Sequence, residues 1–340
     1  MPFRTAIGAF ISTKRRGTGL PLLFSTFFWM GSICFAGVPL SGEAALVRKA
    51  LDQVYRMDYV AAEETLTKGL PAESPSRPYF AGLACMNRFL DWGDTVALRR
   101  AEGYWENLSP RGEASKAYRK TDPGDLQLYR GLAGVQLSYA ATLRGQRLRA
   151  ASLALASNSL LADLKAPEAR ATRMLYEYYR GRILENLPFV SEAELDVPGF
   201  RAAVAEAPAL REMFQGSLFW IHMDGARYPE AQAIATEFLE RFPENRLMRQ
   251  MRADVLFRSG KTAEARAAYE KLREEYAALP TTAGRLPLGY FRCVGNLARI
   301  QAAAGDRRGA EARRAEWNRA EGLDLMPWLP PQLRRDLARL

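Results

Sequence analysis

The sequence predicts an all-α protein built from repeated pairs of antiparallel helices. A turn residue recurs with a small residue, usually Ala, five positions later, each time between two segments with apolar residues at helical spacing. The clearest pairs are Gly145 with Ala150, Gly260 with Ala265 and Gly305 with Ala310. The composition agrees, because 48% of the residues are hydrophobic and 25% are charged, as packed amphipathic helices require. A small side chain lets two helices cross closely, so the pattern predicts a solenoid of α-hairpins.

Three other turns keep this pattern in a weaker form. They are Met57 with Ala62, which lacks the glycine; Gly93 with Leu98, which lacks the small residue; and Gly225 with Ala231, which has one extra residue between them. The hairpin is therefore expected along most of the chain, with a degenerate N-terminal half.

Residues 1–36 have the features of an export signal. Basic residues ending at Arg16 precede a hydrophobic run at 20–35, and the small residues Ala36 and Gly37 follow it. We expect a signal peptide over 1–36 and a periplasmic protein. The alternative is an inner-membrane anchor at residues 20–40, although the run of about 16 apolar residues is shorter than the roughly 20 that a spanning helix prefers.

The segment 37–187 is predicted to contain the degenerate hairpins. Apolar spacing predicts helices at 43–55, 58–70, 78–90, 94–108, 125–145, 146–164 and 168–187. Three prolines between 71 and 78 predict a loop, since proline interrupts a helix. The polar stretch 109–125 is either a loop or a short, poorly packed helix.

An irregular connection is predicted at 188–208, where three prolines surround an acidic patch, with a short helix near 200–206. The segment 209–340 has the most regular pattern. Its predicted helices span 210–224, 228–241, 246–259, 263–276, 288–304 and 308–320, and a basic capping helix closes the chain.

Residues 210–277 resemble the tetratricopeptide repeat family. The interval from Ala231 to Ala265 is 34 residues, which is the period of that repeat. Ala231 opens the second helix of a pair, Pro243 stops it, and Tyr269 stands near the usual aromatic position of the next unit. The resemblance implies a right-handed superhelix of helix pairs with a concave binding surface, and it implies no chemistry.

We therefore expect a scaffold or adaptor that binds a protein or peptide partner in a concave groove, without catalysis and without a cofactor. Aromatic and Arg side chains on the first helices of the pairs would line the groove. The candidates are Tyr129, Tyr139, Tyr176, Arg180, Trp220, Arg252 and Arg292. One alternative is a structural accessory of polysaccharide or outer-membrane assembly, and a lesser one is an envelope enzyme on a helical scaffold.

The net charge and its distribution bear on which partners are expected. The formal net charge is +10, but residues 1–36 hold four basic residues and no acidic one, which leaves +6 for the rest. This excess is spread along the chain without a stripe of basic and aromatic residues, so nucleic acid is not an expected partner. An anionic envelope polymer or a lipid surface remains a possible partner.

Few residues suggest chemistry. His222 is the only histidine, and we expect it to be structural. Cys85 and Cys293 lie in apolar helical patterns and are predicted to be buried free thiols. Metal ligands at the usual spacings and phosphate-binding loops are absent from the sequence. In the cluster Tyr176, Tyr178 and Tyr179, helical geometry prevents all three from facing one core, so we expect core packing for some and a groove, a neighbouring hairpin or solvent for the others.

Overall fold

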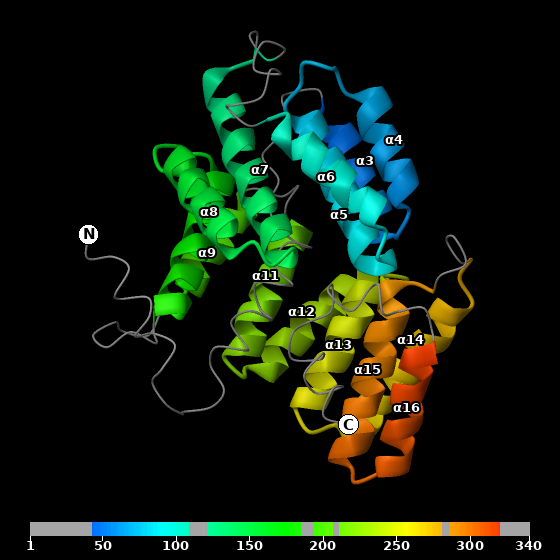
Figure 1. Ribbon diagram of the computed structural model, residues 1–340. Coiled ribbons are helices and arrows are strands. Elements are labelled where there is room, and N and C mark those ends of the chain that lie inside the picture. Colours follow the sequence, from blue (N-terminus) through cyan, green and yellow to red (C-terminus); the bar gives the residue numbers. More distant parts are fainter. Residues whose placement is uncertain are drawn as a thin grey trace, which may run out of the picture.

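The computed structural model describes residues 43–108, 118, 121–184, 194–206, 211–280 and 286–319, without the side chains of 182–184 and 318–319. Within these residues the protein is all-α, with 14 helices packed mostly as sequential antiparallel pairs (Figure 1). The predicted signal segment and the predicted C-terminal capping helix lie outside the described residues. No described helix has both the length and the hydropathy needed to cross a membrane.

The helices follow the predicted ranges closely. Their bounds are α3 Ala44–Tyr55, α4 Tyr59–Gly69, α5 Ser76–Trp92, α6 Thr95–Glu106, α7 Pro123–Leu143, α8 Arg147–Leu161, α9 Pro167–Leu184, α10 Val197–Ala205, α11 Arg211–Asp224, α12 Tyr228–Arg241, α13 Arg246–Arg258, α14 Thr262–Ala277, α15 Leu288–Ala303 and α16 Arg307–Arg319. The helix α5 starts within the predicted 71–78 loop, because proline is tolerated in a first helical turn and Pro78 lies there.

Six helix pairs share one turn geometry. A residue with positive φ ends the first helix of α3–α4, α5–α6, α7–α8, α11–α12, α13–α14 and α15–α16. These residues are Met57 (φ 67°), Gly93 (74°), Gly145 (72°), Ala226 (54°), Gly260 (83°) and Gly305 (78°). The residues five positions later are all buried: Ala62, Leu98, Ala150, Ala231, Ala265 and Ala310. The sequence pattern therefore marks real hairpin turns.

One turn was misassigned from the sequence. The residue in the left-handed conformation is Ala226, not Gly225, so the α11–α12 turn also keeps the spacing of five to Ala231. The N–H of Ala226 donates to the carbonyl of Met223 and the N–H of Arg227 to that of His222, at 3.3 and 2.8 Å. This is the Schellman arrangement, which requires a left-handed residue whatever its side chain.

The same pair of hydrogen bonds occurs at four other turns. The second bond of each pair joins a backbone N–H to the backbone carbonyl five residues earlier: Asp58 to Gln53, Gln146 to Ala141, Lys261 to Leu256 and Asp306 to Gln301. At Gly93 a single bond to the carbonyl of Phe89 replaces them. A common capping requirement thus explains why the spacing recurs along the chain.

The hairpins do not form a simple open row. In Figure 1, α3–α6 lie at the upper right, α7–α9 at the left, and the chain returns through α11 and α12 to α13–α16 below α5. The helix α5 contacts α15, which is far from it in the sequence. In an ideal repeat array each unit contacts only its neighbours, so this chain closes on itself.

The buried core crosses the predicted segment boundary. One hydrophobic cluster runs from Val47 to Val255, and a second occupies residues 253–317 of α13–α16. Within the predicted connection at 188–208, α10 is capped by Asp196, whose carboxylate accepts from the N–H of Gly199 at 3.0 Å. The first cluster therefore joins the N-terminal hairpins to the start of the C-terminal array.

Candidate functional site

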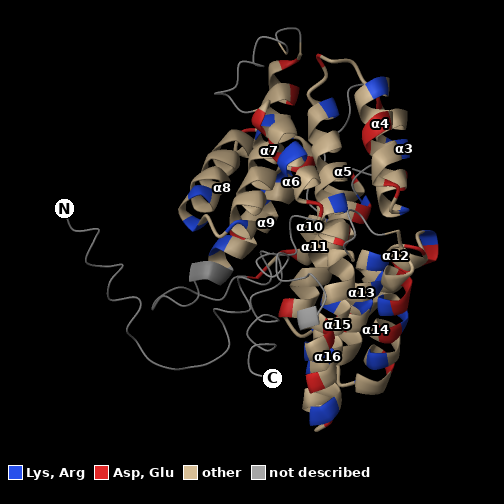
Figure 2. Cartoon of the chain, turned by 45° about the vertical axis from the view of Figure 1, so that its right-hand side comes forward, with Lys and Arg blue, Asp and Glu red and all other residues tan. Residues whose placement is uncertain are grey.

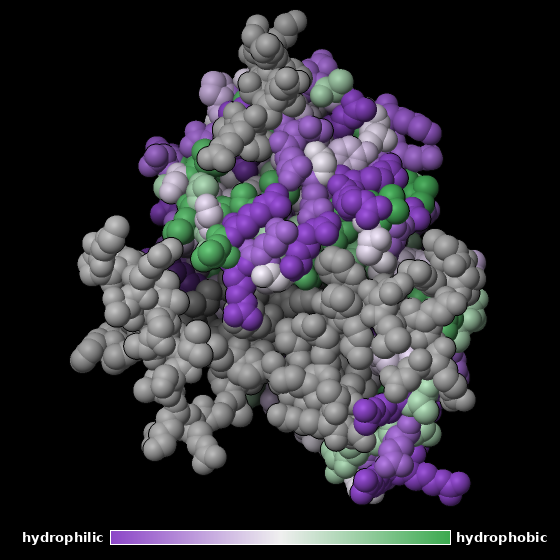
Figure 3. Space-filling view, in the orientation of Figure 1, coloured by the Kyte–Doolittle hydropathy of each residue, from purple (hydrophilic) through white to green (hydrophobic). Residues whose placement is uncertain are grey.

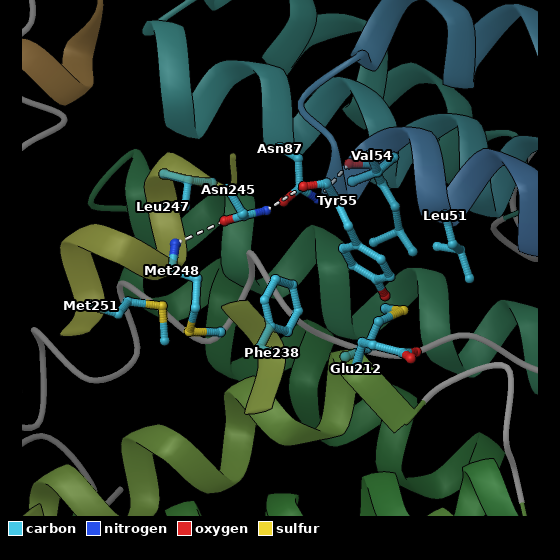
Figure 4. A pocket seen from close by; sticks show the side chains of 12 residues that line it. Leu51, Val54, Tyr55, Asn87, Glu212, Phe238, Asn245, Leu247, Met248 and Met251 are labelled. Carbon is cyan, nitrogen blue, oxygen red and sulfur yellow. Dashed lines mark hydrogen bonds between the residues drawn. The ribbon is translucent and has the colours of Figure 1, made fainter. Parts of the chain in front are cut away.

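The candidate site is a small cavity where the N-terminal hairpins meet the C-terminal ones (Figure 4). Its volume is about 40 Å³. Helices α3 and α5 form one side of the cavity. The other side consists of α11, α12 and α13, together with Asn245, the N-cap of α13. The lining residues are Leu51, Val54, Tyr55, Leu83, Asn87, Glu212, Met213, Phe238, Asn245, Leu247, Met248 and Met251. All of them are buried except Asn87, which is half-buried.

Aromatic contacts and an asparagine hold the two sides together. The Tyr55 ring lies edge-on to Phe238, with 5.5 Å between the ring centroids, and Phe242 packs on it at 5.1 Å. Asn245 donates its amide to the carbonyl of Tyr55 at 2.8 Å and accepts from the N–H of Met248 at 2.8 Å. Asn245 therefore caps α13 and fixes α3 beside it.

The Tyr55 hydroxyl is a polar group of this contact that forms no hydrogen bond with the described residues. It is buried and has no hydrogen-bond partner among the described residues. In Figure 4 the ring extends toward the side of the cavity formed by Glu212. Burial, followed by the nearby negative charge of Glu212, raises the pKa of Tyr55 well above its usual value. The hydroxyl therefore stays protonated and can donate one hydrogen bond.

Glu212 is a buried carboxylate whose charge is already neutralised. Arg48 donates two hydrogen bonds to it, at 3.0 and 3.2 Å, and Arg241 donates a third. Burial opposes its ionisation, but the hydrogen bonds from Arg48 and the charges of both arginines outweigh burial and lower the pKa of Glu212. Glu212 is thus an ion-pair anchor between α3, α11 and α12, and a weak base.

A second polar cluster holds α5 against α13, α14 and α15. Asp91 is fully buried and accepts from Arg246 at 2.6 Å and from the Tyr276 hydroxyl at 2.7 Å. Arg292 donates to the carbonyl of Leu90 at 3.1 Å. We name Asp91, Arg246, Tyr276 and Arg292 the junction cluster. It closes the chain across 155 to 202 residues of sequence.

The predicted groove residues do not gather on one open surface. Tyr129, Tyr139, Trp220 and Arg292 are buried, with exposed fractions of 0 to 4%. Tyr176 and Arg252 are half-buried, and Arg180 is exposed and pairs with Glu177. The reason is clearest at Arg292: the chain closes on itself, so this first-helix side chain meets α5 instead of a partner.

The other singled-out residues lie mainly in the core. Cys85 and Cys293 are free and buried, as predicted, and burial raises the pKa of the Cys85 thiol to about 12. Tyr178 and Tyr179 are buried and pack edge to face. His222 is buried too, and burial lowers its pKa. Among the described residues, no cluster of His, Cys, Asp and Glu could hold a metal ion.

The described surface offers one helix with an uncovered apolar face. Ala150, Ser157 and Leu161 of α8 face α7, while Leu148 and Leu155 on the opposite side are 89% and 60% exposed. Ser152 and Ser159 continue this stripe and are also exposed. We call Leu148, Ser152, Leu155 and Ser159 the α8 face. Figure 3 shows hydrophobic side chains gathered at the left, where Figure 1 places α8.

Charge on the rest of the surface is mixed. Figure 2 shows Lys and Arg interleaved with Asp and Glu on most helices, whereas α8 carries no acidic residue. Many arginines are in ion pairs, for example Arg144 with Glu102 at 2.6 Å and Arg249 with Glu275 at 2.5 Å. The positive excess is therefore dispersed, as the sequence predicted.

Sequence reasoning missed Tyr55, Glu212 and the junction cluster apart from Arg292. The available signal was a lone acid in an apolar helix: Asp91 follows "MNRFL" and Glu212 precedes "MFQGSLFW". The described residues form an all-α protein of sequentially paired helices. The chain matches no protein-family model, no curated protein and no solved structure.

Proposed function

We propose that this protein is a non-catalytic, exported scaffold of tetratricopeptide-like hairpins that binds a protein partner through the α8 face. The observation that carries the proposal is the exposure of Leu148 and Leu155, seven residues apart on one side of α8. Exposed apolar side chains grouped on one face mark protein interaction sites, whereas singly scattered ones are ordinary surface residues.

The shape of the α8 face suggests the kind of partner. Ser152 lies between the two leucines and Ser159 lies beyond Leu155. Ala151 and Ala156 lie on either side of this stripe, and all four of these small residues are exposed. Such small side chains let a second helix approach closely, with its own apolar residues seated between the two leucines. The partner segment is therefore an amphipathic helix. A face on one helix of 15 residues is smaller than a stable interface, so this contact is transient or extends beyond α8.

The test is affinity capture from an envelope extract at low and at high salt, with paired variants. Leu148→Glu with Leu155→Glu should abolish capture of a stoichiometric protein that wild type retains at high salt. The matched control is Val60→Glu with Val96→Glu, since these valines are 51% and 54% exposed on α4 and α6. The control should retain capture.

Two results would contradict the proposal. Equal capture by both double variants would remove the α8 face as the binding site. Recovery of only polysaccharide or lipid, lost as salt rises, would favour the envelope-assembly function instead, because contacts between exposed charges are screened by salt.

A further inference from the structure

The α8 face is self-complementary when two copies of α8 run in opposite directions. Its leucines and serines alternate, and they are spaced symmetrically about the midpoint between positions 153 and 154. In an antiparallel pair centred at this midpoint, Leu148 of each copy lies opposite Ser159 of the other. Leu155 likewise lies opposite Ser152. Each leucine then packs over a small side chain, which is how residues of two helices interdigitate. A two-fold interface requires this kind of match, because both partners contribute the same patch.

The surroundings of the α8 face leave room for a second helix. The small residues Ala151, Ala156 and Ala162 lie beside the leucines and are exposed. The helix α8 packs on α7 and, less extensively, on α9, and Figure 1 places it at the outer edge of the described helices. Short side chains allow two helix axes to approach to about 8 Å. The leucines of each copy can therefore be covered by the other copy.

Charge favours the antiparallel direction over the parallel one. Arg147 and Arg149 are exposed in the first turn of α8, which has no acidic residue, and Asp163 is exposed just beyond its last turn. A parallel pair would bring the arginines of both copies together, and like charges repel. An antiparallel pair instead places these arginines near the C-terminal end of the other copy of α8. The helix dipole is negative there, and Asp163 adds a full negative charge.

We propose that a second copy of this chain occupies the α8 face, in an antiparallel, two-fold pair that is centred between positions 153 and 154. This inference rests on the proposed function and identifies its protein partner. The pair involves one helix of 15 residues per copy, which is below the size of a stable interface, so we expect a dissociation constant of about 0.1 mM. The dimer is therefore transient and forms where the chain is concentrated.

The first measurement is sedimentation velocity of the full chain over a range of concentrations, at low and at high salt. Wild type should show a concentration-dependent dimer that persists at high salt, because the contact is mainly apolar. Leu148→Glu with Leu155→Glu should weaken the dimer about tenfold or more, since the pair would then bury carboxylates without counter-charges. Val60→Glu with Val96→Glu adds the same charge on α4 and α6 and should leave the dimer unchanged.

Disulfide trapping tests the direction and the register of the pair. Every chain carries Cys34→Ser, and the remaining thiols, Cys85 and Cys293, are buried with raised pKa values and so react slowly. Under mild oxidation, a mixture of Leu148→Cys and Ser159→Cys chains should form a mixed disulfide dimer. Leu148→Cys alone should not, because position 148 of the other copy lies level with position 159, about 16 Å away along the helix and beyond the reach of a disulfide.

Three results would overturn the inference. They are a chain that stays monomeric at millimolar concentration, a dimer that both double variants weaken equally, and a disulfide that Leu148→Cys forms alone as readily as the mixture does. The capture experiment judges the proposed function separately. If wild type is monomeric but the Leu148→Glu, Leu155→Glu variant loses capture of a different protein, the α8 face binds that protein and only the second copy is excluded. If capture is also unchanged, both proposals fail.

Discussion

At the scale of the residue, backbone conformation explains the most regular feature of this chain. Each of the six similar hairpins ends its first helix with a left-handed residue, which glycine adopts without a steric penalty and most other residues adopt with one. Two of these positions, Met57 and Ala226, are not glycine. They therefore store strain that the other four turns avoid.

Ala226→Gly should stabilise the protein by about 1 kcal/mol, because it removes the side chain from a left-handed position at a modest entropic cost. Gly260→Ala should destabilise it by a similar amount, even though the new methyl group would meet no atom within 4 Å. Urea denaturation of both variants measures these effects. Changes of the same sign would show that turn strain is not the cause.

Glu168 is the residue whose environment predicts a pH dependence. It is 1% exposed, and neither carboxylate oxygen has a side-chain partner among the described residues. Burial raises its pKa from 4.5 to about 7. The folded state therefore binds this proton more tightly than the unfolded state, and the stability it contributes below pH 4.5 is lost as the pH rises through 7.

Glu168→Gln should consequently unfold at the same denaturant concentration as wild type near pH 4.5. At pH 8 the variant should be more stable by about 3 kcal/mol, since it no longer buries a charge. Denaturation at the two pH values tests this. A stability difference that is the same at both would mean that Glu168 is ionised and solvated in the folded protein.

At the scale of the element, close packing fixes α8 on α7. A methyl group added at Gly134 would lie 2.2 Å from the Ser157 hydroxyl oxygen, and one at Gly131 would lie 2.6 Å from Leu161. The Ser138 hydroxyl also donates to the carbonyl of Ala150 at 2.7 Å. These contacts orient α8 so that Leu148 and Leu155 face outward.

Gly134→Ala should destabilise the protein by about 1 kcal/mol, because the Ser157 hydroxyl must rotate away from the new methyl group and lose its hydrogen bond to the carbonyl of Leu153. Gly103→Ala is the matched control: its methyl group would meet nothing within 4 Å, and alanine has the higher helix propensity. The control should be neutral or slightly stabilising in thermal denaturation. A Gly134→Ala variant as stable as Gly103→Ala would show that the α7–α8 contact is loose.

Helices and turns were predictable from the sequence because their determinants are local. Apolar spacing and turn residues placed α11–α16 within a few residues of their observed ends. The start of α5 was predicted late, since Pro75 and Pro78 are read as helix breakers although the first is the N-cap and the second lies in the first turn. The left-handed conformation of Ala226 could not be predicted from the sequence, because the neighbouring Gly225 is the residue usually found in that conformation.

At the scale of the whole molecule, closure of the chain is what local patterns could not predict. The contacts of Tyr55 with Phe238 and of Asp91 with Arg246 join residues that share no periodicity. The groove residues were predicted on the assumption of an open array, and the closed arrangement buries Arg292 instead. The cavity lies between segments that this closure brings together, so local sequence patterns could not predict it either.

Asp91→Asn tests the junction cluster. It would leave the buried Arg246 guanidinium without its carboxylate, and the protein should lose about 3 kcal/mol of stability. Burial is the largest single effect and lowers the pKa of Arg246, but the charge and hydrogen bond of Asp91, together with Tyr276 and Tyr59, raise it above its usual value, so the charge remains. Glu64→Gln, which breaks an exposed pair with Lys68, should change stability by less than about 0.5 kcal/mol. Similar losses in both variants would contradict a central role for the cluster.

The most direct test of the proposed function is photocrosslinking in living cells. A photoreactive amino acid replaces Leu148 in one variant and Val60 in the other. We expect a discrete adduct with one protein from position 148 and none from position 60. No adduct at 148, or the same adducts at both positions, would contradict a binding site on the α8 face.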